Sequence, residues 1–279
     1  MSELQVLIDG FMLGESPRWH DGRLWFCDWG RQQVVAVALD GTREVITSLP
    51  SFPFCIDRLP GGRLLIISAR DGRLLRREPD GSLATHSELA ALSGKPWNDI
   101  VVDGRGNAYV GNLGFDFPGG EFAPGTLALV TPDGSARQAA DGLAFPNGIV
   151  VTPDNSTLIV AESYGNKLTA FDIGADGSLS NRRVWAHLGD DVPPDGICLD
   201  ADGAIWYADV PNKRCVRVRE GGTVLDTIEP GLGCFACALG GPDRQTLFIV
   251  ANQWPLPTGG SRTGRVVAAA APAPGAGWP

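Results

Sequence analysis

One hydrophobic pattern returns along the whole length of this chain. Each copy opens with a short polar or proline-containing segment, continues through an apolar run, turns at Asp and Gly residues, and ends in a second apolar run. Clear copies begin at Gly14, Trp97, Pro146 and Pro194, and weaker ones begin at Cys55 and Ala236. Short apolar runs bounded by turn residues are typical of β-strands, and no segment keeps a helical period. The pattern therefore predicts an all-β protein.

The spacing of the copies predicts the architecture. One equivalent position in each copy gives six anchors, at Glu15, Cys55, Asn98, Asn147, Asp195 and Ala236. The steps between them are 40, 43, 49, 48 and 41 residues, and a four-stranded propeller blade needs about 40–50. We therefore predict a single domain over residues 1–279, a six-bladed β-propeller with four-stranded antiparallel blades around a central channel. Strand-like runs at residues 4–8 and 265–271 should share the last blade and close the ring.

A pair of β-sandwiches is the alternative all-β arrangement. It gives no reason for the same strand–turn–strand segment to return six times. The 37 glycines and 21 prolines are spread along the chain, as expected for many short strands joined by tight turns. The sequence therefore favours the propeller over two β-sandwiches.

Four of the six anchors carry a side-chain oxygen, and these are Glu15, Asn98, Asn147 and Asp195. Equivalent positions of propeller blades converge on the central axis at one depth. Two carboxylates alone in a narrow channel would repel each other, and a divalent cation removes that penalty. An all-oxygen donor set without His or Cys favours Ca²⁺, with Mg²⁺, Mn²⁺ and Zn²⁺ as alternatives. We therefore predict one divalent metal ion as a cofactor.

Each of these residues has a simpler interpretation when it is taken alone. Asn147 and Asp195 each precede a glycine, and Asn-Gly and Asp-Gly are common turn dipeptides. Asn98 could cap a turn, and Glu15 could be an exposed surface residue. The shared repeat position of all four residues favours the metal site.

Charge and composition exclude several classes of function. The formal net charge is −9 without any basic stretch, which argues against binding to nucleic acid or to an anionic membrane surface. The sequence shows no secretory signal and no apolar run long enough to cross a bilayer, so we expect a cytoplasmic protein. Motifs of serine hydrolases, phosphate-binding loops, zinc proteases and dinucleotide-binding folds are missing from the sequence. Its three histidines lie away from the anchors.

The six cysteines are expected to be reduced and buried, because their spacing does not resemble a disulfide scaffold. Cys234 and Cys237 form a CxxC motif without a second metal-binding pair. A structural role is the simpler interpretation, and a redox role stays open. The sequence does not indicate an oligomeric state.

The anchor segments resemble the gluconolactonase, regucalcin and senescence-marker-protein family of six-bladed propellers. The matching motifs are Gly14-Glu15-Ser16-Pro17-Arg18-Trp19, Asn98-Asp99, Pro146-Asn147-Gly148 and Pro194-Asp195-Gly196. The resemblance covers residues 10–255 and rests on the order and spacing of these motifs. It implies one catalytic divalent metal held by Glu15, Asn147 and Asp195, with Asn98 contacting the metal or the substrate.

The resemblance also bears on the substrate, which we expect to be a small lactone. It implies an acidic substrate contact in the loop where Asp116 lies, with Glu121 as a weaker alternative. Members that act on sugar lactones often carry Arg where this chain has Pro96. Trp97 and Phe145 lie beside the metal-ligand positions and are predicted to give the substrate apolar contacts instead.

The predicted function is metal-dependent hydrolysis of a lactone. The metal would polarise the carbonyl group, water would attack the carbonyl carbon, and Asp195 would act as general base. In the alternative mechanism Asp195 only binds the metal. Two alternative functions also stay open. One is phosphotriester hydrolysis on the same metal site, as in the related diisopropylfluorophosphatases and paraoxonases, and the other is calcium binding without catalysis.

Overall fold

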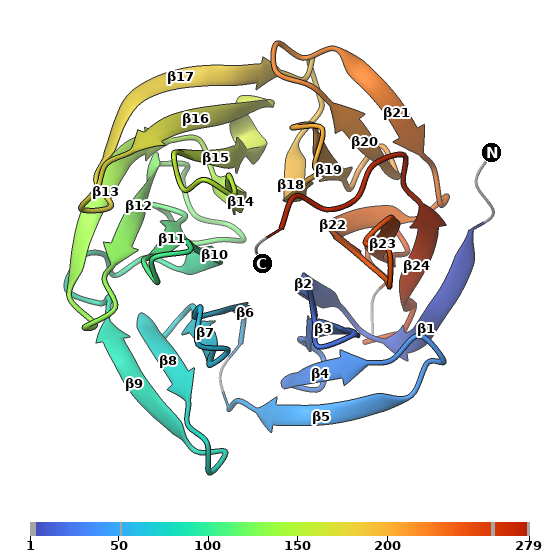
Figure 1. The fold of residues 1–279 in the computed structure, drawn as a ribbon, viewed down its shortest axis with the longest axis horizontal. Coiled ribbons are helices and arrows are strands. Elements are labelled where there is room, and N and C mark those ends of the chain that lie inside the picture. The colour runs from blue at the N-terminus through green and yellow to red at the C-terminus, as the bar shows by residue number, and fades with distance from the viewer. Residues whose placement is uncertain (1–3, 51, 258–259, 278–279) are drawn as a thin grey trace.

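The computed structural model describes residues 4–50, 52–257 and 260–277. These residues form six four-stranded antiparallel sheets arranged as a ring, which confirms the predicted six-bladed propeller (Figure 1). In every sheet the innermost strand comes first in the hydrogen-bonded order given below.

The first three blades follow one another in the chain. The first contains β2 (Gly14–His20), β3 (Arg23–Asp28), β4 (Gln33–Val37) and β5 (Arg43–Ser48). The second contains β6 (Phe54–Arg58), β7 (Leu64–Ser68), β8 (Arg73–Arg77) and β9 (Leu83–Glu88). The third contains β10 (Trp97–Val102), β11 (Ala108–Asn112), β12 (Gly125–Val130) and β13 (Ala136–Leu143).

The other three blades complete the ring. The fourth contains β14 (Pro146–Val151), β15 (Thr157–Glu162), β16 (Lys167–Ile173) and β17 (Leu179–His187), with a 3₁₀ turn, η1 (Ser163–Gly165), between β15 and β16. The fifth contains β18 (Pro194–Leu199), β19 (Ile205–Asp209), β20 (Arg214–Val218) and β21 (Val224–Ile228). The sixth contains β22 (Gly233–Gly240), β23 (Thr246–Asn252), β24 (Gly264–Ala270) and β1 (Gln5–Phe11).

The ring closes because the sixth blade combines both ends of the chain. β1 pairs antiparallel with β24, with Gln5 opposite Ala268 and Asp9 opposite Arg265. This pairing makes the N-terminal strand the outermost strand of the last blade (Figure 1). It covers a sheet edge that would otherwise be open to water and to other strands.

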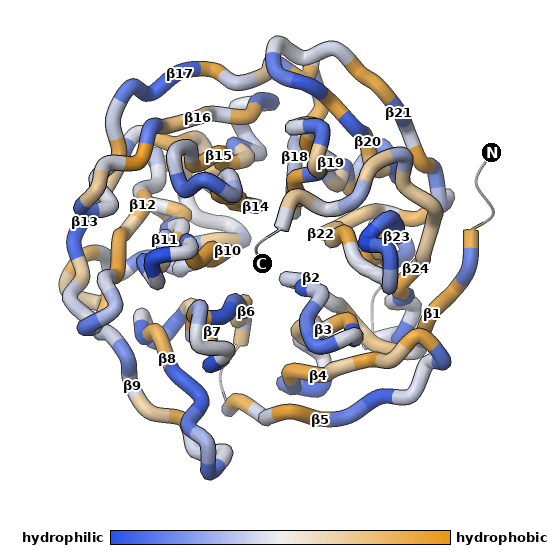
Figure 2. The backbone as a smooth tube through the Cα atoms, in the orientation of Figure 1, coloured by the Kyte–Doolittle hydropathy of each residue, from blue (hydrophilic) through white to orange (hydrophobic). Residues whose placement is uncertain are grey.

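The hydrophobic core lies between neighbouring blades. All residues of β7, β11 and β19 are buried, whereas most of β5 and β21 are exposed or half-buried. Figure 2 shows hydrophilic stretches along outer strands such as β9 and β17. The continuous apolar runs of the sequence are therefore middle strands covered on both faces, and the alternating runs are outer strands with one wet face.

The innermost strands depart from regular geometry where the anchors lie. The pairing register shifts just after Glu15 and across Asn98, Asn147 and Asp195, and β22 also carries a shift. The continuous pairing of β6, which carries Cys55, shows no such shift. A β-bulge turns side chains away from the regular pleat and is frequent beside active sites. The bulges thus let the four anchor residues turn toward the channel.

Candidate metal centre

The four oxygen-bearing anchors occupy the same place in four blades. Each is the second residue of an innermost strand, Glu15 in β2, Asn98 in β10, Asn147 in β14 and Asp195 in β18. Close packing of neighbouring inner strands fixes this arrangement. A Cβ atom on Gly148 would lie 2.7 Å from the Asp195 carbonyl oxygen, so only glycine fits there.

The structure brings these side chains together at the channel. Glu15, Asn98 and Asn147 line one cavity of about 10 Å³, which is roughly the space that a single water molecule needs. Asp195 accepts a hydrogen bond from the Asn147 side chain and repels Glu15 electrostatically. The four residues therefore form one cluster, as their repeat positions predict.

Hydrogen bonds to neighbouring groups orient the two amides. Nδ2 of Asn98 donates to the Pro146 carbonyl oxygen at 3.2 Å, and Nδ2 of Asn147 donates to Oγ of Ser163 at 3.2 Å. Ser163 in turn donates to the Pro194 carbonyl oxygen at 2.7 Å. Because the nitrogens are engaged, each amide oxygen is left for the cavity.

The electrostatics of the cluster fit a cation. Burial, followed by repulsion from Asp195, raises the pKa of Glu15 well above its usual value. Burial also raises the pKa of Asp195 to about 8, although the hydrogen bond from Asn147 acts in the opposite direction. A divalent cation between them would favour both ionised forms. Two carboxylates and two amide oxygens are also the donors that a hard cation prefers.

Backbone strain accompanies two of these residues. Ser16, next to Glu15, has φ 53°, and Phe145, two residues before Asn147, has φ 62°. A positive φ is uncommon outside glycine, and strained residues cluster at functional sites. Oγ of Ser16 donates to the Ile56 carbonyl oxygen and accepts from the Ile56 amide, which ties the Glu15 turn to the second blade.

A buried ionic cluster lies beside the four anchors, and sequence reasoning missed it. Nη2 of Arg18 lies 3.4 Å from Asp99 and Nε lies 3.7 Å from Asp57. Arg18 also donates to the Ile100 carbonyl oxygen at 2.7 Å. Burial raises the pKa of Asp57 to about 7, although Arg18 acts in the opposite direction. Arg18 and Asp99 both lie in the recognised motifs, but no repeat position links them.

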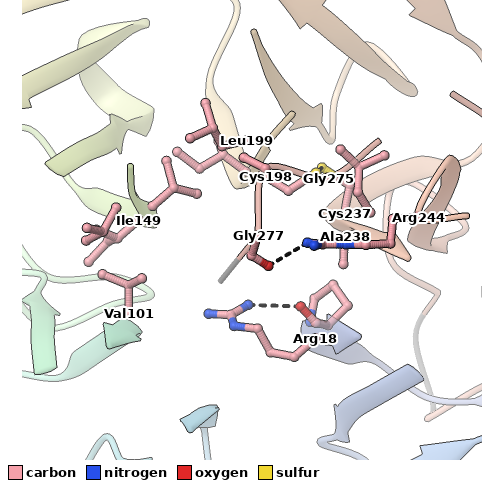
Figure 3. A pocket seen from close by; sticks show the side chains of 16 residues that line it. Arg18, Val101, Ile149, Cys198, Leu199, Cys237, Ala238, Arg244, Gly275 and Gly277 are labelled. Atoms are coloured by element: carbon pink, nitrogen blue, oxygen red, sulfur yellow. Dashed lines mark hydrogen bonds between the residues drawn. The ribbon is translucent and has the colours of Figure 1, made fainter. Parts of the chain in front are cut away.

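The C-terminal segment lies over the other end of the channel. Its residues 271–277 run toward the centre of the ring (Figure 1). Arg244 donates a hydrogen bond to the Gly277 carbonyl oxygen at 2.5 Å, and Arg18 lines the same pocket (Figure 3). The backbone amide of Ala276 donates to the Leu199 carbonyl oxygen at the end of β18. The C-terminal segment therefore covers the end of the channel at which the inner strands finish.

Besides Asn98, three residues were predicted to contact the substrate, and they lie in different surroundings. Trp97 is 1% exposed and packs in the core between the second and third blades. Its assignment as a substrate contact is therefore corrected to a core role. Asp116 is exposed on the loop between β11 and β12 and pairs with Lys95 at 2.7 Å. Phe145 lies in an aromatic cluster at the same end of the channel.

The family model described as SMP-30/Gluconolactonase/LRE-like region matches residues 13–253 of this chain. The chain belongs to this family. The resemblance found in the anchor motifs is thereby confirmed.

Three similar proteins illustrate the range of the SMP-30/gluconolactonase/LRE-like family. Regucalcin of Xenopus laevis is 28% identical over 257 residues, covering 88% of this chain and 84% of the relative. Pentonolactonase of Haloferax volcanii is 24% identical over 262 residues, covering 89% and 84%. The solved structure of a gluconolactonase from Xanthomonas campestris has a TM-score of 0.78 at 25% identity, covering 97% and 90%.

Within the described ranges, no three His, Cys, Asp or Glu side chains gather as metal ligands, and the candidate centre itself has two carboxylates and two amides. All six cysteines are free thiols, and Sγ of Cys198 lies 3.7 Å from Sγ of Cys237. In the part of the chain that the structure describes, no helix has the length and apolarity to span a membrane.

Metal addition should raise the thermal stability of the purified protein, and more so at alkaline pH. Without metal, the raised pKa of Asp195 gives stability that is complete below about pH 4 and lost as pH rises through about 8. A cation offsets that loss because it favours the ionised carboxylates. We expect Ca²⁺ in large excess to raise Tm by about 5 °C at pH 8.5, and by less at pH 6.

The measurement is a thermal melt of EDTA-treated protein with Ca²⁺, Mg²⁺, Mn²⁺ or Zn²⁺ added back. Sodium chloride at matched ionic strength controls for salt effects. An unchanged Tm with every cation at both pH values would contradict the metal centre.

Proposed function

We propose that this protein is a divalent-metal-dependent hydrolase that opens a small lactone. One observation carries the proposal. Two half-buried carboxylates and two carboxamides meet at the start of four inner strands, where Glu15, Asn98 and Asn147 line a small cavity and Asp195 lies beside Asn147. Membership of a family that includes lactonases supports the reaction class. Ca²⁺ is the proposed metal because all four donors are oxygens.

The bound cation would polarise the substrate carbonyl and stabilise the negative charge that develops on its oxygen. Glu15 and Asp195 supply two negative charges to hold it, and Asn98 and Asn147 supply neutral oxygens. Arg18 pairs with the further carboxylates, Asp57 and Asp99, and offsets part of the repulsion by which Asp99 raises the pKa of Glu15 and of Asp195.

Asp195 is the proposed general base. Asn147 bonds its carboxylate, and an oxygen lone pair directed at a neighbouring water would accept the proton as that water attacks the carbonyl carbon. The ring C–O bond then breaks, and the proton held by Asp195 passes to the leaving alkoxide. The products are the open hydroxy acid and a restored base, so the step consumes only water.

A substrate panel tests this proposal against its alternatives. Purified protein is assayed on lactones and on phosphotriesters, each after EDTA treatment and after re-addition of Ca²⁺, Mn²⁺, Zn²⁺ or Mg²⁺. We expect lactone hydrolysis that EDTA abolishes and one of the cations restores. Hydrolysis of phosphotriesters alone would favour the phosphotriesterase alternative. Metal binding without any turnover would favour a calcium-binding protein, and EDTA-resistant lactonase activity would overturn the metal mechanism.

A further inference from the structure

The loops at the ligand end of the channel can be identified from the strand registers. In the third blade, Trp97 pairs with Asn112, which also pairs with Thr126 on the next strand. In the fourth blade, Pro146 pairs with Glu162, which also pairs with Lys167. Residues 113–124 and the turn after Glu162 therefore lie at the end where Asn98 and Asn147 begin their strands.

Five aromatic side chains form a continuous cluster on these loops, which we call the aromatic wall. Its members are Phe115, Phe117, Phe122, Phe145 and Tyr164. Ring centroids are 4.8 Å apart for Phe145 and Tyr164, 5.0 Å for Phe117 and Phe145, and 5.6 Å for Phe115 and Phe122. The wall joins the long loop of the third blade to the fourth blade.

The aromatic wall lies directly beside the candidate metal centre. Phe145 lies two residues before Asn147, and its carbonyl oxygen accepts a hydrogen bond from the Ser163 amide at 3.0 Å. Ser163 contacts the Asn147 side chain, and Tyr164 follows it in the chain. On the other side, the amide of Leu113 donates to the Pro96 carbonyl oxygen, two residues before Asn98. The wall thus stands beside two of the four ligands.

Part of the wall is buried, and part of it faces solvent. Phe115 and Phe145 are buried, whereas Phe117 is 44%, Phe122 48% and Tyr164 52% exposed. Clustered exposed rings on a firmly packed base are unusual for a plain protein surface and typical of a ligand-binding face. The buried pair holds the exposed rings in place, so little conformational freedom is lost when a ligand binds.

We propose that the aromatic wall binds an aryl or similarly planar apolar group carried by the lactone. The preferred substrate class is then an aryl-substituted lactone rather than a polyhydroxylated sugar lactone. This inference rests on the proposed lactonase function, and it adds the wall as the specificity-determining surface. Ring stacking against Phe117, Phe122 and Tyr164 supplies the affinity, while the metal centre acts on the carbonyl group.

Kinetics with matched lactones test the inference. We compare γ-phenyl-γ-butyrolactone, γ-methyl-γ-butyrolactone and glucono-δ-lactone in the parent protein and in Tyr164→Ala and Phe122→Ala. Val224→Ala, on the outer strand β21, is the matched control because it also removes an exposed apolar side chain. Values of kcat/KM should be about tenfold higher for the phenyl than for the methyl lactone in the parent. In each wall variant, KM for the phenyl lactone should rise, so that most of the preference is lost. The kcat/KM for the methyl lactone should stay unchanged.

A binding measurement separates failure of this inference from failure of the proposed function. Saturation-transfer NMR on EDTA-treated protein detects contact with the phenyl lactone without turnover. We expect strong transfer to the phenyl protons, reduced in Tyr164→Ala and retained in Val224→Ala. If no lactone is hydrolysed but saturation transfer to the phenyl protons persists, the lactonase proposal fails. The aromatic wall would then still be an aryl-binding surface. Equal kcat/KM for phenyl and methyl lactones, a preference for gluconolactone, or unchanged transfer in Tyr164→Ala would overturn the inference.

Discussion

Replacing Asp195 by Asn should lower kcat by about 10²–10⁴-fold while leaving the fold intact, the range typical for loss of a general base. Asn keeps the shape of the side chain and one ligand oxygen, but it has no basic lone pair to take a proton from water. Removal of one of two buried like charges should also relieve repulsion with Glu15, so the thermal stability of the metal-free variant should not fall.

Asn98→Ala is the matched variant that distinguishes loss of a general base from loss of a metal ligand. It removes one neutral donor oxygen, and the contacts of Asn98 do not include Asp195. We expect it to weaken metal binding and to regain most of its kcat at saturating metal, whereas Asp195→Asn should not. Steady-state kinetics across a metal titration give both results. If Asp195→Asn binds metal normally and turns over at the parent rate, Asp195 is a ligand only.

Replacing Arg18 by Met should lower the free energy of unfolding by about 3–5 kcal/mol, because it leaves Asp57 and Asp99 buried without their cation. The loss should be larger at pH 8 than at pH 5. The pKa of Asp57 is about 7 with Arg18 present and should rise further without it. At pH 5 the carboxyl group is then protonated and needs no partner, and stability falls as pH rises through the folded pKa.

Urea unfolding in EDTA at both pH values measures this effect. Arg183→Met is the control, since Arg183 pairs with Asp172 at 2.6 Å with both side chains 40% or more exposed. Arg183→Met should lower the free energy of unfolding by less than about 1 kcal/mol. A loss for Arg18→Met that is equally small, or that is the same at pH 5 and pH 8, would show that Arg18 does not neutralise the buried carboxylates.

The sequence allowed the blades and the clustering of the four anchors to be predicted because both depend on local repetition. Each blade repeats the same strand–turn–strand segment, so equivalent residues must meet at the axis. Glu15, Asn98, Asn147 and Asp195 were found in this way, and the structure places all four at the second position of an inner strand.

The remaining features depend on contacts that no repeat encodes. Arg18 reaches Asp99 across 81 residues, and the aromatic wall combines side chains from two blades. Trp97 was misassigned because it adjoins Asn98. Successive residues of a strand face opposite sides, so a neighbour of a channel-facing residue points into the sheet packing instead. That rule could have identified Trp97 as a core residue.

Anomalous diffraction from crystals grown with MnCl₂ tests the central claim most directly. We expect one manganese peak in the channel, within about 2.0–2.6 Å of oxygens from Glu15, Asn147 and Asp195. Asn98 should contribute a fourth oxygen directly or through one water. An empty channel in crystals soaked at saturating metal, or a peak bound by other residues, would contradict it.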